Sequence, residues 1–483
     1  MNKNKLKIVF VAAALTVVGA AGCRKESLLY PSSETSVDSQ NAFASAGRIE
    51  GQVTGFYNAL KHGQFYGGRY LVYNDIRADN FLNETSNGVT GFQTWGHNLS
   101  NGTDEVGNVW TRAYRAINFA NLFIDGMNNG GTEVVGEAKA SEYIGEAQFI
   151  RALSYYSLLQ LYAKPYTADN GASPGVPLRL TGNEGAGDYA LARSSVAEVY
   201  AQILEDLSAA EASLPDTYGD PLLNTTRAHK NTAIALKVRV LLTMGNYDEV
   251  VTEANKIVGA SAPFTASSGV SMSLASDYAS IFVPPYLSDE SIFSLPMAAN
   301  SAPGTQNALQ YYYMDNEEYT LNPDGIVGNA SWQDNDARRG FIEDGERGGP
   351  ILTKFAVPNP WTDYVPVIRY AEVLLSLGEA ITRSTNSVDA RAVELLNAVR
   401  HRSDATTTFS TSDFASADAL AEAFVTERNI EFLGEGIRSI DIQRLGLTYP
   451  ARGGVPAVSP SDPAYTWPIP SGELLYNPLM EDN

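Results

Sequence analysis

The sequence predicts a mainly α-helical protein in which a helical-repeat scaffold is interrupted by long, irregular, aromatic-rich loops. Apolar residues recur at three- and four-residue steps in several separate segments, which is the period of an amphipathic helix. Some of these segments follow one another after short polar turns, as antiparallel helix pairs do. Two other stretches lack this period and are rich in Gly, Asn, Ser and Tyr, a composition typical of loops.

The composition excludes several classes of protein. The chain has 483 residues, of which 44% are hydrophobic, so it can bury a sizeable core. Its formal net charge of −21 repels phosphate backbones and argues against nucleic-acid binding. A single cysteine excludes an intramolecular disulfide and a cysteine-based zinc site.

The N-terminus carries a targeting signal. Residues 1–7 are basic, residues 8–21 are apolar, and small residues lead directly to Cys23. Because a membrane span needs about 20 apolar residues, the shorter run predicts a signal peptide over residues 1–22. The small residues before the one cysteine resemble a bacterial lipobox, which implies that Cys23 is acylated. The alternative is an ordinary signal peptide with an incidental cysteine.

A polar tether and then the first helices follow. Residues 23–40 are polar and Ser-rich, so they predict a lipidated tether rather than a folded element. Helices are expected over residues 42–59, 109–127 and 137–162, the last being the longest. Another is expected from Ser195 to Leu214, because Ser195 and Glu198 have the spacing of a capping box.

Two helix pairs and a last helix complete the predicted scaffold. Residues 229–244 and 247–258 flank a Gly-Asn turn, and the sequence MGNYDEVVTEANKIV resembles the turn of a tetratricopeptide repeat. Residues 365–383 and 388–402 form the second predicted pair, and the last helix covers residues 417–433. We therefore expect one domain over residues 41–483. Its predicted parts are a tetratricopeptide-like scaffold (41–260 and 365–445), a loop-rich ligand-binding excursion (261–364) and a C-terminal extension (446–483).

The two aperiodic stretches are where binding is expected. Residues 56–97 hold nine aromatic residues in 42, and residues 257–337 hold nine acidic residues and neither Lys nor Arg in 81. Loops of this length are uncommon in compact domains unless they are functional.

The sequence carries few signatures of catalysis. It contains no GxGxxG, GxxxxGK[ST] or HExxH motif, and its four histidines have no metal-ligand spacing. Asp334-Asn335-Asp336 lacks the spaced ligands of a calcium loop. We therefore expect no enzyme activity, no cofactor and no metal. A glycosidase stays open as an alternative, because a pair of carboxylates brought together by folding cannot be excluded from sequence.

Aromatic residues in the two stretches are the candidate ligand contacts. Sugar rings stack their C–H faces on Trp and Tyr, and Asn and Asp side chains bond the hydroxyls. The candidates are Trp95, Trp332, Tyr311, Tyr312, Tyr70, Tyr73, Asp79 and Asn80. The alternative for each aromatic residue is a place in the core. Because the second stretch has no basic residue to pair with acidic sugars, a neutral glycan is the expected ligand, with a neutral or cationic peptide as the alternative.

Five ordered motifs resemble one family. The first is GEAQFIRALSYY with a following Pro165-Tyr166, and the second is VIRYAEVLL. The third is LNAVRHR, the fourth runs from Glu427-Arg428 through EGIRSIDIQR, and the fifth is WPIP with Glu473 and Asn477-Pro478. Together with the lipobox they resemble the SusD/RagB family of nutrient-binding outer-membrane lipoproteins of Bacteroidetes.

This resemblance implies a function and a location. It implies a lipoprotein that captures oligomeric nutrient and covers a SusC-like TonB-dependent transporter as its lid. The protein would be held in the outer membrane by lipid on Cys23 and face the outside. A peptide-binding member of the same family is the alternative.

The charged motif residues are expected to be structural. Their helical spacing suits buried ion pairs between neighbouring helices. They are Arg369, Glu372, Arg400, Glu427, Glu431, Arg438 and Asp441.

Overall fold

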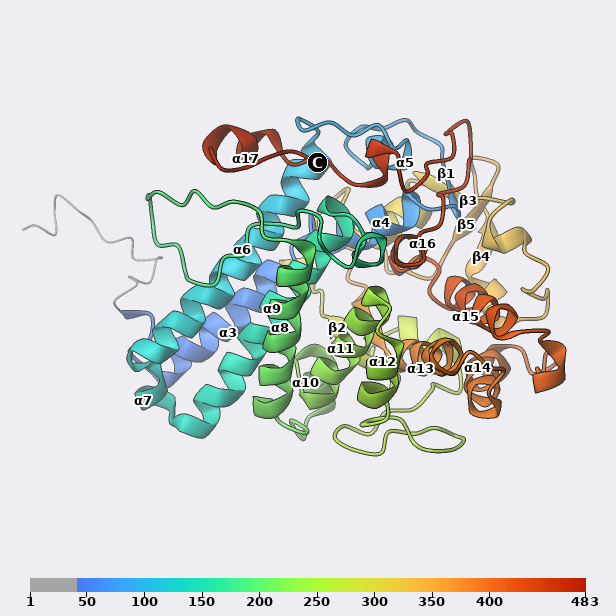
Figure 1. Cartoon of the computed structure of the whole chain (residues 1–483), viewed down its shortest axis with the longest axis horizontal. Helices are drawn as coiled ribbons and strands as arrows, with labels where there is room; N and C mark the ends of the chain where they lie inside the picture. Colours follow the sequence, from blue (N-terminus) through green and yellow to red (C-terminus); the bar gives the residue numbers. More distant parts are fainter. Residues whose placement is uncertain (1–40) are drawn as a thin grey trace, which may run out of the picture.

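The computed structural model describes residues 41–483, and Figure 1 shows them as one helical body with short strands along one side. The predicted signal peptide and the whole tether, Cys23 included, lie outside the described residues. Among residues 41–483, no helix is both long and apolar enough to span a bilayer.

The scaffold is a series of helices that pack on one another in chain order. α3, α6, α8, α9, α11, α12 and α13 each contact the next in this series, and α14 and α15 both pack on α13. The helices are α3 (Ala46–Leu60), α4 (Arg69–Ile76), α5 (Phe92–Trp95), α6 (Asp104–Gly126), α7 (Thr132–Val135), α8 (Glu137–Tyr162), α9 (Val196–Ser213), α10 (Pro221–Thr226), α11 (Lys230–Met244), α12 (Tyr247–Ala254), α13 (Tyr370–Thr385), α14 (Ala390–Ser403), α15 (Ala417–Glu431), α16 (Arg438–Arg444) and α17 (Ser471–Tyr476). The mainly α-helical repeat scaffold predicted from the sequence is confirmed.

Local sequence signals set several of these boundaries. The expected helix over residues 137–162 has the predicted bounds. Ser195 and Glu198 form the predicted capping box, with both reciprocal hydrogen bonds present at the start of α9. Gly245 ends α11 in the left-handed conformation, with φ of 77°, which turns the chain into α12.

The predicted helix over residues 365–383 is wrong in its first five positions. Residues Val365–Arg369 form the buried strand β6, and α13 begins at Tyr370. β-branched residues favour the strand, and Pro366 has no backbone N–H for an interior helical hydrogen bond. Antiparallel pairing of β6 with β2 (Ser291–Leu295) then decides between the two conformations.

The loop-rich excursion is ordered by short strands and single turns. β1 (Phe81–Asn83) pairs antiparallel with β3 (Tyr319–Leu321), which ties the two aromatic stretches together across more than 230 residues. β4 (Ile342–Asp344) pairs with β5 (Pro350–Leu352) in a second small sheet. Figure 1 shows these strands beside α4 and α16, above α15, which itself lies above α13 and α14.

A buried ion network joins β6, α14 and α15. Arg369 bonds Glu431, Glu435 and Glu290 at 2.5–2.8 Å, and all four side chains are nearly inaccessible to solvent. Arg402 contacts the same Glu290 and Glu431 from α14. Arg338, in the loop-rich excursion, also bonds Glu431, at 2.9 Å. One carboxylate on α15 therefore holds three cations from three segments.

The other predicted charge residues also form ion pairs. Glu372 pairs with Arg239 of α11, Arg400 pairs with Glu427, and Asp441 pairs with Arg428 and Arg444. Arg438 differs, because it pairs with Asp79 at the edge of a cavity. The prediction that these residues form ion pairs is confirmed, but not all of the pairs join two helices, because Arg369 lies on β6 and Asp79 lies outside the helices.

Candidate ligand-binding site

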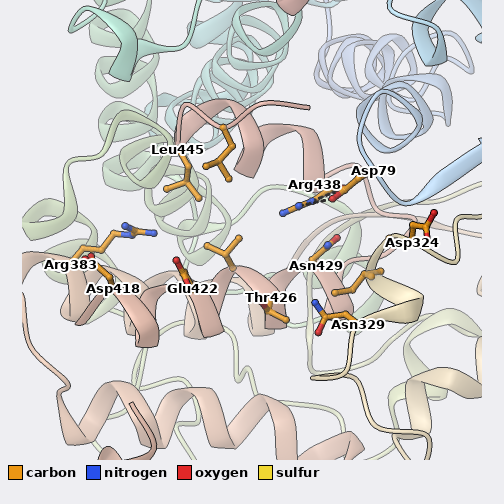
Figure 2. Close-up of a pocket in the computed structure, with 14 residues that line it drawn as sticks. Asp79, Asp324, Asn329, Arg383, Asp418, Glu422, Thr426, Asn429, Arg438 and Leu445 are labelled. Carbon is orange, nitrogen blue, oxygen red and sulfur yellow. Dashed lines mark hydrogen bonds and ion pairs between the residues drawn. The ribbon is translucent and has the colours of Figure 1, made fainter. Parts of the chain in front are cut away.

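A cavity of about 590 Å³ opens between α15, α16 and the segment after β3 (Figure 2). We call it the α15 pocket. Its lining residues are Asp79, Asp324, Gly325, Ile326, Asn329, Arg383, Asp418, Glu422, Val425, Thr426, Asn429, Arg438, Leu445 and Leu447. A volume of this size is in the range of small-molecule and oligomer sites.

Helix α15 forms one wall of the pocket. Asp418, Glu422 and Thr426 are spaced four residues apart, and Val425 and Asn429 are similarly spaced, so all lie on one face of the helix. Figure 2 shows Asp418, Glu422, Thr426 and Asn429 along the same ribbon. Ser416 caps the start of the helix, and its side chain accepts a hydrogen bond from the backbone N–H of Ala419.

A fixed ion pair forms the opposite wall. Arg438 of α16 donates to both carboxylate oxygens of Asp79, from Nε at 2.8 Å and from Nη2 at 2.7 Å. Burial alone would raise the pKa of Asp79, but hydrogen bonds and charge from Arg438 outweigh burial and hold that pKa below its usual value. Asp79 is therefore ionised and held in one orientation at neutral pH.

Asn80 lies behind the wall and orients a lining residue. Its Nδ2 donates to Oδ1 of Asn429 at 2.7 Å, and its own Oδ1 accepts from the backbone N–H of Ile326. Asn80 is 1% exposed. Because Oδ1 of Asn429 is already an acceptor, the amide nitrogen of Asn429 is the group left to donate to a ligand.

The pocket is polar and acidic. Among the ion pairs of residues 41–483, none involves Asp324, Asp418 or Glu422, whereas the one remaining cation, Arg383, pairs with Glu379 at 2.7 Å. Three unpaired carboxylates accept hydrogen bonds from hydroxyl groups and repel anions. The chemistry of the pocket therefore suits a hydroxyl-rich neutral ligand or a cationic one.

Most of the predicted aromatic contacts are in the core. Trp95, Tyr70, Tyr73 and Tyr312 are at most 7% exposed, and the indole N–H of Trp95 donates to the carbonyl of Phe81 at 2.9 Å. A buried ring presents no face to a sugar, so we correct this part of the prediction. The physical reason is that aromatic rings near Gly and Asn pack just as well against one another as against a ligand.

Trp332 and Tyr311 also lie outside the pocket lining. Trp332 is 3% exposed, and the guanidinium of Arg339 covers its ring at 4.6 Å, although Asn329, three residues earlier, lines the pocket. Tyr311 is partly exposed and packs edge-on against Trp361, with ring centroids 6.0 Å apart. Of the eight predicted contacts, the structure places only Asp79 on the pocket surface and Asn80 directly behind it.

The sequence analysis missed the residues of α15. The four-residue repeat Asp418, Glu422 and Thr426 was visible in the sequence, but a polar stripe on a helix most often faces solvent. Nothing in the sequence shows that α16 and the segment after β3 lie against that stripe.

A second, smaller cavity does contain aromatic side chains. It has a volume of about 290 Å³ and lies between α6, the segment around residue 180 and α17. Tyr114, which is partly exposed, lines it beside Trp110, which is 5% exposed and donates from Nε1 to Glu473 at 3.3 Å. Asn118 and Arg179 supply polar groups. This cavity is therefore the alternative place for a stacked sugar.

Two catalytic arrangements, a serine paired with a histidine at the GxSxG stretch and a metal centre, are not found in the described residues. Residues 171–175 have the GxSxG spacing, but Ser173 lies in a loop and its hydroxyl donates to Asp169 at 2.5 Å, with no histidine among its partners. Within residues 41–483, no group of three His, Cys, Asp or Glu side chains is arranged to hold a metal ion.

Comparisons with known proteins agree with this fold. Residues 32–242 match a family model described as starch-binding and associating with the outer membrane, and residues 310–483 match the SusD family model. SusD-like protein P2 of Formosa agariphila is 25% identical, and the alignment covers 99% of each chain.

Solved structures give the same result. A SusD superfamily protein from Bacteroides fragilis is 36% identical, with a TM-score of 0.83 and coverage of 91% of this chain and 99% of that one. Surface glycan-binding protein A from Bacteroides thetaiotaomicron, solved in complex with laminarihexaose, is 17% identical and shares the fold, with a TM-score of 0.71 and coverage of 91% and 99%. With a 36% identical relative matched over almost its whole length, two family models and five motifs in order, this chain belongs to the SusD/RagB family.

Proposed function

We propose that this protein binds an oligomeric nutrient, a neutral glycan, in the α15 pocket and passes it to a SusC-like TonB-dependent transporter. One observation carries the choice of site. The pocket combines ionised Asp79, oriented Asn429 and three unpaired carboxylates in a cavity of about 590 Å³. Such a set of fixed donors and acceptors matches the hydroxyls of a sugar chain.

Membership of the family supports a glycan as the ligand. One matching model is described as starch-binding, and a structural neighbour was solved with laminarihexaose, a neutral glucan. The unpaired carboxylates of the pocket favour a ligand without negative charge. We propose no catalytic role, because binding and delivery need neither a general acid nor a nucleophile.

The proposed location follows from the N-terminal sequence. Acylation of Cys23 would anchor the folded domain to the outer membrane, and residues 24–40 would let it reach a transporter beside it. The protein would then act as the lid of that transporter, which supplies the energy for translocation.

A peptide ligand is the second candidate function. The acidic lining of the pocket suits a peptide that carries Lys or Arg as well as it suits a neutral glycan. A glycosidase is the less favoured alternative, and it would release reducing ends from the glycan that it binds.

The test is a binding experiment on residues 24–483. Calorimetry would measure affinity for neutral glucans, acidic glycans and basic peptides, in the wild type and in Asn429→Ala. Loss of the amide that faces the ligand is expected to weaken binding of the neutral glycan about tenfold, the effect of about 1.4 kcal/mol. Glu394→Ala is the matched control, since Glu394 is an exposed residue of the neighbouring helix α14.

Each other outcome separates the alternatives. Weakened binding in Tyr114→Ala but not in Asn429→Ala would move the site to the second cavity. Binding of basic peptides alone would favour the peptide function, and binding of acidic glycans would contradict the proposed site. Release of reducing ends would show a glycosidase.

A further inference from the structure

Two arginines are buried without a carboxylate partner. Arg77, directly after α4, is 1% exposed, and Arg452, in the C-terminal extension, is 5% exposed. No ion pair in the described part of the chain, residues 41–483, includes either guanidinium. Neither side chain has a role in the α15 pocket.

This arrangement is unusual within the molecule itself. Seven other buried arginines each pair with a carboxylate; they are Arg151, Arg239, Arg338, Arg369, Arg400, Arg428 and Arg444. Arg69 is also buried without a carboxylate partner, but none of its nitrogens is both buried and without a hydrogen bond. Arg77 and Arg452 therefore differ from the other buried arginines in two ways. Neither pairs with a carboxylate, and each has buried nitrogens without a hydrogen bond.

Each guanidinium leaves two nitrogens unused. Nη2 of Arg77 donates to the carbonyl of Tyr465 at 2.6 Å, and Nη2 of Arg452 donates to the carbonyls of Ile76 and Trp95 at 2.8 and 2.7 Å. Nε and Nη1 of both arginines are buried and have no partner. Four nitrogens of two cations therefore need an acceptor.

The two arginines lie near each other, because Arg452 donates to the carbonyl of Ile76, the residue before Arg77. The guanidinium of Arg77 lies over the ring of Tyr449 at 5.1 Å, and that ring lies 4.9 Å from the imidazole of His97. Nε2 of His97 is 2.8 Å from the carbonyl oxygen of Arg77. Burial and then the charges of Arg77 and Arg452 lower the pKa of His97 to about 3, so the imidazole adds no further positive charge at neutral pH.

The surrounding groups do not neutralise this pair. Asp79 is the carboxylate that acts most strongly on Arg452, but both of its oxygens are bonded to Arg438. Burial and the charge of Arg77 both lower the pKa of Arg452, to about 10, so Arg452 is still a cation at neutral pH. Water could satisfy N–H groups, but it would leave two buried positive charges uncompensated, which is costly.

We propose that a small anion with the charge and size of chloride binds beside Arg77 and Arg452 and accepts hydrogen bonds from their unused Nε and Nη1 groups. The anion would join the end of α4 and the segment around Trp95 to the C-terminal extension. This inference is independent of the proposed glycan site, since it involves other residues.

A crystal of the protein soaked in sodium bromide tests directly whether an anion binds beside the two arginines. Bromide replaces chloride and scatters anomalously. The expected result is an anomalous peak within hydrogen-bonding distance of Nε or Nη1 of Arg77 or Arg452. Ordered water at these nitrogens, with no anomalous peak, would overturn the proposal.

A solution experiment tests it without a crystal. The unfolding temperature would be measured while chloride replaces gluconate at constant ionic strength. We expect a saturable rise of about 2 °C for the wild type, and none for Arg452→Met. Arg115→Met, which removes an exposed cation, is the control and should behave as the wild type.

Two solution results would contradict the proposal. One is a wild type that does not respond to chloride, and the other is a response that persists in Arg452→Met, since the anion would then bind elsewhere. If Arg452→Met does not fold, Arg452→Lys keeps the charge but has fewer donors, and a weaker response to chloride is expected.

Discussion

At the scale of single residues, burial decides what each polar side chain does. Asp79 and Asp75 are four residues apart, yet Arg438 holds the first ionised, whereas the second has no cation bonded to it. Asp75 accepts hydrogen bonds at Oδ2 from Tyr313 and from the backbone of Gly436, and its Oδ1 has no partner. Burial raises the pKa of Asp75 to about 8.

Asp75 should make stability depend on pH. Its pKa is higher in the folded state than its ordinary value of 3.8, so the folded protein holds a proton that the unfolded chain loses. The free energy of unfolding should therefore fall as pH rises from about 4 to about 8, by at most about 1.4 kcal/mol per pH unit. Chemical denaturation across this range would measure it.

Asp75→Asn should flatten that profile. The amide oxygen can still accept from Tyr313 and Gly436, and no charge develops at high pH. We expect the variant to be more stable than the wild type at pH 8 and above. Asp216→Asn, at an exposed side chain, is the control, and equal pH profiles for wild type and Asp75→Asn would contradict the assignment.

At the scale of elements, local signals set helix ends and ion pairs set how the helices meet. The capping box at Ser195 fixes the start of α9 without help from the rest of the fold. The boundary between strand β6 and helix α13 instead depends on tertiary structure, because pairing with β2 determines where the strand ends and the helix begins. Glu431 shows how strongly elements depend on one another, since it bonds cations from β6, α14 and the loop-rich excursion.

Ser195→Ala should destabilise α9 by a small, defined amount. Its side chain accepts from the backbone N–H of Glu198, and no other group replaces that acceptor. We expect the free energy of unfolding to fall by about 1 kcal/mol. Ser208→Ala, at an exposed position within the same helix, is the control, and an equal loss there would show that the cap is not responsible.

Glu431→Gln should lower the free energy of unfolding by much more than Ser195→Ala does. The variant leaves Arg369, Arg338 and Arg402 without the charge that they share, and the expected loss is about 3–5 kcal/mol. Asp334→Asn is the control, because its side chain is fully exposed and lies 4.0 Å from Arg339. A loss below about 1 kcal/mol for Glu431→Gln would mean that the network contributes little to stability.

Glu431 should also make the stability of the protein depend on pH in the acid range. Burial would raise the pKa of Glu431, but the charges of Arg402, Arg369 and Arg338 outweigh burial and hold the pKa well below 4.5. Its contribution to stability is therefore present above pH 4.5 and is lost as pH falls through the lower, folded-state pKa. In Glu431→Gln that part of the acid transition should be absent.

At the scale of the whole molecule, the fold brings together segments that are far apart in the chain. Residue 79, the segment after β3, α13, α15 and α16 all line the α15 pocket. The net charge of −21 adds a long-range field of the same sign as the pocket.

This field predicts a preference by ligand charge. At low salt, an oligosaccharide that carries carboxylates or sulfates should bind at least about tenfold more weakly than a neutral one of equal length. Adding salt should reduce the difference, because it screens the repulsion. Titration of matched neutral and acidic glycans at two ionic strengths would measure it, and equal affinities at low salt would contradict an acidic site.

The sequence alone determined the helical class, the full bounds of α8, the capping box of α9, the family and two members of the ion network, Arg369 and Glu431. Each of these depends on local periodicity or on an ordered set of motifs, which are read along the chain. Tertiary structure decided that residues 365–369 form a strand, because the pairing partner β2 lies about 75 residues earlier. It also decided which aromatic rings are buried and which polar stripe lines a cavity. Burial depends on what packs on a side chain, and the groups that cover Trp95 or place Asn429 at the edge of a cavity come from distant parts of the sequence.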